Sequence, residues 1–137
     1  MCSQASNSDV VARAMRALNG ESDLELAILY GSAAAGKMRG DSDVDIAVLF
    51  KAPLDADHKM ELITRLQSEL KRDVDIVDLF HLNGTLLKQI LCRGRVLIKA
   101  NTESLAALTR RMIYNESDMM PYVMRTLMER QRRFIHG

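Results

Sequence analysis

Two aspartates separated by one residue, Asp43 and Asp45, open an apolar strand pattern. Side chains alternate between the two faces of a strand, so both carboxylates are expected on one face. Val44, Ile46 and Val48 are then expected to point into the core. Carboxylates that share a site repel each other, and a divalent cation with oxygen ligands is the simplest compensation. The spacing therefore favours a magnesium-type site.

A third carboxylate is available in residues 73–79, where acidic and apolar residues alternate for most of the segment. Asp73 and Asp75 share one face of a strand in this segment, whereas Asp78 has the opposite parity. From the pattern alone, either Asp73 or Asp75 can complete the site.

The pair Gly31-Ser32 ends an apolar run, residues 24–30, and precedes a short alanine-rich stretch. Glycine lets a phosphate approach the backbone, and the N-terminus of a helix presents free N–H groups to an anion. Ser32 has no histidine near it in the sequence, so phosphate binding explains it better than a nucleophilic role. A phosphate-binding turn followed by strand-borne carboxylates indicates metal-dependent phosphoryl or nucleotidyl transfer.

This arrangement resembles the motif of the nucleotidyltransferase superfamily that includes DNA polymerase beta, kanamycin nucleotidyltransferase and CCA-adding enzymes. Gly31-Ser32, ten further residues, and then Asp43 and Asp45 follow the order of that motif. The resemblance runs from about residue 24 to residue 99. Because the chain is short, it is most similar to the minimal nucleotidyltransferases (MNT), which include the MntA antitoxins of HEPN/MNT toxin–antitoxin systems.

The resemblance implies a role for each acidic residue. Asp43, Asp45 and Asp75 would be the catalytic residues and would also hold Mg²⁺. Asp75 is chosen because it lies between two apolar residues, as the third acid of the family does, and Asp73 is the alternative on the same face.

The resemblance also implies a nucleotide-binding set, Gly31, Ser32 and Lys37. Many members of the family carry an arginine shortly after the Gly-Ser pair, where this chain has Ala35. Lys37 or Arg39 is then expected to supply the cation near the triphosphate.

The activity implied by the resemblance is the Mg²⁺-dependent transfer of AMP from ATP to a hydroxyl of a partner protein. The partner would be a HEPN-type ribonuclease toxin, bound in a hetero-oligomer and neutralised by AMPylation, which makes this chain an antitoxin. One alternative is an aminoglycoside-type adenylyltransferase that modifies a small molecule. Another is a catalytically weak antitoxin that acts by binding alone. Only 38 residues follow the last expected strand, which favours an acceptor that brings its own surface.

The order of helix and strand patterns predicts a single α/β (α+β) domain over residues 1–137, in which helices flank a small mixed sheet. The resemblance implies the polymerase beta-like nucleotidyltransferase fold, with a core over about 24–99 and a helical segment over about 102–135. The expected strands cover 24–30, 44–50, 73–79 and 95–99, and the expected helices cover 8–18, 33–38, 55–71, 83–92, 102–114 and 119–135.

Composition narrows the range of functions. The net charge is +1, which argues against nucleic acid as a direct partner. Apolar stretches are far shorter than a membrane span, and no secretory leader opens the chain, so a cytoplasmic protein without a membrane partner is expected. Residues 41–78 hold ten acids against five bases, whereas residues 79–137 hold four against ten.

Other reactive residues are expected to have ordinary roles. The two cysteines lie far apart, the three histidines are scattered, and Tyr30, Tyr114 and Tyr122 are expected to serve in packing. Five of the nine methionines lie between 112 and 128, so residues 119–135 are a candidate docking surface for the partner.

Overall fold

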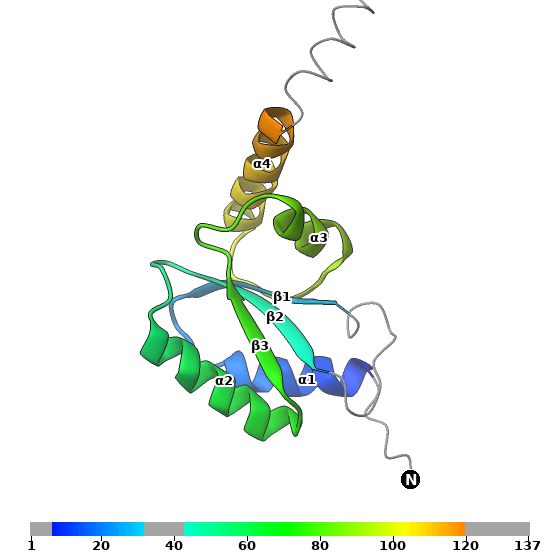
Figure 1. The fold of residues 1–137 in the computed structure, drawn as a ribbon. Helices are drawn as coiled ribbons and strands as arrows, with labels where there is room; N and C mark the ends of the chain where they lie inside the picture. The colour runs from blue at the N-terminus through cyan, green and yellow to red at the C-terminus, as the bar shows by residue number, and fades with distance from the viewer. Residues whose placement is uncertain (1–6, 32–42, 120–137) are drawn as a thin grey trace, which may run out of the picture.

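The computed structural model describes residues 7–31 and 43–119. The stretch 33–38 and residues 120–135, for which helices were expected, lie outside these ranges. The described elements, shown in Figure 1, are α1 (Asn7–Leu18), β1 (Leu24–Tyr30), β2 (Val44–Phe50), α2 (Ala56–Leu70), β3 (Val74–Asp78), α3 (Thr85–Arg93), β4 (Arg95–Lys99) and α4 (Thr102–Met119).

The four strands form one mixed sheet in the order β3-β2-β1-β4. β1 pairs antiparallel with β2 and with β4, and β2 pairs parallel with β3. Helices α1 and α2 cover one face of the sheet, and α3 and α4 cover the other (Figure 1). The expected α/β fold with a small mixed sheet between helices is confirmed.

The core lies on both faces of the sheet. Val44, Ile46 and Val48 are fully buried against α1 and α2, as the alternation of β2 predicts. Ala47 and Leu49, which point the other way, are buried as well, in a second cluster with α3 and α4. The expectation that β2 has one buried face is therefore incomplete, because a sheet covered by helices on both sides buries both sets of side chains.

The ends of α2 follow the rules of helix capping. The carboxylate of Asp55 accepts a hydrogen bond of 2.7 Å from the backbone N–H of His58 and so caps the N-terminus. At the other end, Lys71 adopts a left-handed conformation, with φ of 59°, and donates its backbone N–H to the carbonyl of Gln67. The sharp end of the helix at Leu70 leaves only a short link to β3.

Several expected boundaries differ from the structure by one or two residues; the first helix, for example, was expected from residue 8, but α1 already includes Asn7. One expected boundary is wrong. The polar stretch 115–118 was expected to separate two helices, but α4 runs through it to Met119. Polar residues alone do not end a helix, and this stretch contains no glycine or proline. In the described ranges, no helix is long and apolar enough to cross a bilayer.

Candidate active site

Three side chains lie in a row across neighbouring strands. Asp45 at the start of β2 is in register with Asp75 on β3 and with Tyr30 at the end of β1. Neighbouring strands are about 4.8 Å apart, so side chains in register on one face are close neighbours. The row is on the face covered by α3 and α4, since Tyr30 packs against the hydrophobic cluster of that face. Asp43 lies just before β2 and is exposed.

The register distinguishes between the two acids left open on the third strand. Asp75 is the register partner of Asp45, whereas Asp73 precedes β3, with its carbonyl accepting a 2.9 Å hydrogen bond from the N–H of Val44. The charge of Asp75 raises the pKa of Asp45, whereas Asp73 is not among the groups that shift it. The geometry therefore favours Asp75 as the third acid.

The electrostatics of the row are repulsive. Partial burial raises the pKa of Asp45, and the negative charges of Asp75 and Asp43 raise it further. Burial, followed by the charges of Asp45 and Asp75, raises the pKa of Tyr30 to about 12. The tyrosine hydroxyl therefore stays protonated at neutral pH, and within 7–31 and 43–119 neither carboxylate forms an ion pair.

Gly31, the described residue of the expected phosphate-binding turn, lies against the carboxylate of Asp45. Its φ is +75°, a conformation that side chains rarely adopt. An ideal Cβ at this position would lie 2.5 Å from Oδ2 of Asp45. The backbone conformation therefore favours glycine here, and a side chain would also displace the carboxylate of Asp45. Ser32 and Lys37, the other expected nucleotide-binding residues, lie outside the described ranges.

The three acids fit a hard divalent cation by the chemistry of their donor set. They offer only carboxylate oxygens, which are the preferred ligands of Mg²⁺. None of the ion pairs formed between described residues includes Asp43, Asp45 or Asp75. Over 7–31 and 43–119, however, no group of three or more acidic, histidine or cysteine side chains is placed so that it could hold a metal ion. A Mg²⁺ ion at this row would therefore depend on further ligands from substrate phosphates and water.

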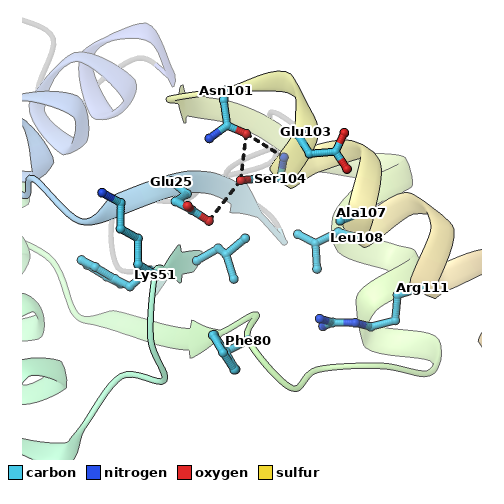
Figure 2. A pocket seen from close by; sticks show the side chains of 11 residues that line it. Glu25, Lys51, Phe80, Asn101, Glu103, Ser104, Ala107, Leu108 and Arg111 are labelled. Atoms are coloured by element: carbon cyan, nitrogen blue, oxygen red, sulfur yellow. Dashed lines mark hydrogen bonds between the residues drawn. The ribbon is translucent and has the colours of Figure 1, made fainter.

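A pocket of about 490 Å³ lies at the opposite end of the same sheet (Figure 2). Its wall includes Glu25 and Lys51, near the paired ends of β1 and β2 that are farthest from the acidic row. Ser104 joins Glu25 to Asn101 through hydrogen bonds of 3.1 and 3.0 Å, and Asn101 caps the first turn of α4. These contacts attach α4 to β1. None of the acids in the row lines this pocket.

The polymerase beta nucleotidyltransferase domain model matches residues 14–103, a range that contains every strand and the whole acidic row. The chain belongs to this family. A search of curated proteins gave no significant match.

Several solved structures share the fold of this nucleotidyltransferase. In a crystal structure of a toxin–antitoxin with AMP-PNP, one chain is 27% identical with a TM-score of 0.70, and the match covers 86% of this chain and 98% of that one. A chain of the MntA–HepT toxin–antitoxin is 25% identical with a TM-score of 0.64, covering 87% and 97%. A complex of tri-AMPylated Shewanella oneidensis HEPN toxin with MNT antitoxin contains a chain 27% identical with a TM-score of 0.64, covering 89% and 98%.

The sequence pattern did not single out Tyr30 as a functional residue. It was assigned to packing, and its ring does pack against the core. The sequence signal that could have identified Tyr30 was its position directly before Gly31, at the end of an expected strand. The pairing of β1 with β2 is needed to place it in register with Asp45.

Proposed function

We propose that the chain is a Mg²⁺-dependent protein adenylyltransferase that transfers AMP from ATP to a hydroxyl of a HEPN-type toxin. It would form a hetero-oligomer with that toxin and neutralise it as its antitoxin. The observation that carries the proposal is the register of Asp45 with Asp75 beside Gly31, inside a nucleotidyltransferase domain. Solved relatives with AMP-PNP and with an AMPylated HEPN toxin support ATP as donor and a protein as acceptor.

Each residue of the site has a defined task in this proposal. Asp43, Asp45 and Asp75 would hold Mg²⁺, which when bound neutralises phosphate charge and polarises the α-phosphate. Gly31, whose φ of +75° is one that side chains rarely adopt, would offer its backbone to the β- and γ-phosphates. Ser32 and Lys37 would complete the contacts to the triphosphate.

The transfer is an in-line displacement. The acceptor hydroxyl oxygen forms a bond to the α-phosphorus, the bond from that phosphorus to the bridging oxygen of the β-phosphate breaks, and pyrophosphate leaves. The proton of the hydroxyl passes to the carboxylate of Asp75, which is exposed and therefore accessible to an incoming acceptor.

The deciding experiment is transfer of label from α-³²P-ATP to the protein encoded by the neighbouring reading frame, with Mg²⁺ present. Label is expected on that protein with the wild-type chain and not with Asp45→Asn. Asp57→Asn is the matched control, because it makes the same change on an exposed carboxylate of α2. Label on an aminoglycoside instead would support the small-molecule alternative, and toxin inhibition without any label would support binding alone.

A further inference from the structure

The guanidinium of Arg111 on α4 is held in place by two backbone carbonyls. Its Nη1 atom donates a hydrogen bond of 2.9 Å to the carbonyl of Leu79 and one of 3.1 Å to the carbonyl of Leu82. These two bonds use both hydrogens of Nη1 and tie α4 to the turn that follows β3. The Nε and Nη2 atoms carry the other three N–H donors of the group. That edge of a guanidinium matches the two oxygens of a carboxylate or phosphate group.

Arg111 lines the pocket of about 490 Å³ at the end of the sheet away from the acidic row. Figure 2 shows its guanidinium reaching from α4 toward Phe80. Leu49, Phe50 and Leu108, each at most 8% exposed, give the pocket an apolar floor. A volume of this size is within the range of pockets that hold small molecules. A fixed guanidinium beside an apolar floor fits a ligand that has an anionic head and an apolar body.

The wall of the pocket also contains other charged side chains. Its two cations and two acids are Lys51, Arg111, Glu25 and Glu103. Glu103 pairs with Arg110 at 2.6 Å, so a neighbouring cation already offsets its charge. The carboxylate of Glu25 accepts a hydrogen bond of 3.1 Å from Ser104, which is about two helical turns from Arg111 on α4. Within 7–31 and 43–119, no carboxylate forms an ion pair with Arg111. Its positive charge is therefore available to an anion from outside the chain.

We propose that this pocket is a binding site for a small amphipathic oxoanion. Arg111 binds the carboxylate or phosphate head through Nε and Nη2, and the apolar floor holds an uncharged body such as an aromatic ring. The site is separate from the proposed nucleotidyl-transfer site, because none of the three acids of that site lines the pocket. The inference therefore stands or falls independently of the transfer of AMP.

Binding is tested on the full chain with two acidic probes, 4-phenylbutyrate and phenyl phosphate, and with 4-phenylbutanol as the uncharged counterpart of the first. Titrations followed by ¹⁵N NMR locate the site and give the affinity. Amide signals of residues 79–82 and 104–111 are expected to shift with the acidic probes. 4-Phenylbutyrate is expected to bind at least about tenfold more tightly than 4-phenylbutanol, because hydrogen bonds to charged groups contribute that much. The tighter of the two acids identifies the preferred head group. Equal affinity for the acid and the alcohol would overturn the proposal.

Arg111→Gln removes the positive charge and is expected to weaken the binding of 4-phenylbutyrate by at least about tenfold. Arg110→Gln is the matched control, because Arg110 is the next residue of α4, is exposed and does not line the pocket. It is expected to bind the probe as the wild type does. The melting temperature of Arg111→Gln is also expected to fall, since Nη1 no longer joins α4 to the carbonyls of Leu79 and Leu82.

A second variant tests the pocket while keeping Arg111 and its two hydrogen bonds. Ala107 lines the pocket and is exposed on α4, so a larger side chain there can occupy the pocket without entering the core. Ala107→Phe is expected to lose the binding of 4-phenylbutyrate and to keep a melting temperature within about 2 °C of the wild type. If Ala107→Phe and Arg111→Gln both bind the probe as tightly as the wild type, Arg111 only tethers α4 and the proposal is overturned.

Discussion

The carboxylate of Asp45 fills the space that a side chain at position 31 would need. Oδ2 of Asp45 lies 2.5 Å from the ideal Cβ position at Gly31, which has a φ of +75°. Real Cβ atoms essentially never approach a neighbour so closely. A side chain at position 31 would require the carboxylate of Asp45 to move, so the backbone at Gly31 and the side-chain conformation of Asp45 depend on each other.

Replacement of Gly31 by alanine is expected to destabilise the fold by about 2 kcal/mol or more, because a left-handed conformation costs a non-glycine residue roughly 1–2 kcal/mol before any collision. Gly20→Ala, with free space and no positive φ, controls for the substitution itself. Urea unfolding measures both variants. A loss for Gly31→Ala no larger than that for Gly20→Ala would contradict the conformational requirement at position 31.

The raised pKa of Asp45 predicts that the wild type and Asp45→Asn differ in stability by an amount that depends on pH. Burial and the neighbouring Asp75 and Asp43 disfavour its charged form in the folded chain. The stability that the folded chain gains from the protonated carboxyl of Asp45 is fully present below the ordinary pKa of 3.8. It is lost as the pH rises through the raised pKa of the folded chain. In EDTA at neutral pH, Asp45→Asn is therefore expected to melt above the wild type, with a difference that shrinks as the pH falls. Asp57→Asn should show no such difference from the wild type. An Asp45→Asn variant with a melting temperature below that of the wild type at neutral pH would refute the electrostatic explanation.

The two acids on the third strand make a matched pair for mutation. Asp75→Asn is expected to reduce AMP transfer by at least about 100-fold, because Asp75 is in register with Asp45 and, in the proposed mechanism, would serve both the metal and the acceptor proton. Asp73→Asn makes the same chemical change two residues away, before β3 begins, and is expected to keep near wild-type activity. Initial rates with labelled ATP decide between them. An inactive Asp73→Asn with a fully active Asp75→Asn would mean that Asp73 is the third acid.

Nucleotide binding is expected to depend on the divalent cation. The triphosphate and the acidic row carry charges of the same sign, so ATP approaches only when a cation lies between them. Calorimetry should show affinity for ATP at least about tenfold weaker in EDTA than in Mg²⁺. Asp45→Asn should reduce the effect of EDTA, since one of the repelling charges is gone. Equal ATP affinity of the wild-type chain with and without Mg²⁺ would place the nucleotide away from these acids.

Sequence patterns predicted the strands 24–30, 44–50 and 95–99 with the bounds that the structure has. These segments are short apolar runs between turn residues, and such signals are local. The helix boundary expected near residues 115–118 was wrong, because polarity is a weaker signal than glycine or proline and α4 continues. The roles of Ser32 and Lys37 stay predictions.

The sequence by itself determined the residue types of the site and their order along the chain: a glycine turn, two carboxylates at the start of one strand and a third on a later strand. Only the tertiary structure decided which of these residues are neighbours. The pairing of β2 with β1 and with β3 places Tyr30, Asp45 and Asp75 in one row and leaves Asp73 outside β3. Strand pairing joins residues that are far apart in the chain, and it depends on how helices bury both faces of the sheet, which no local pattern encodes.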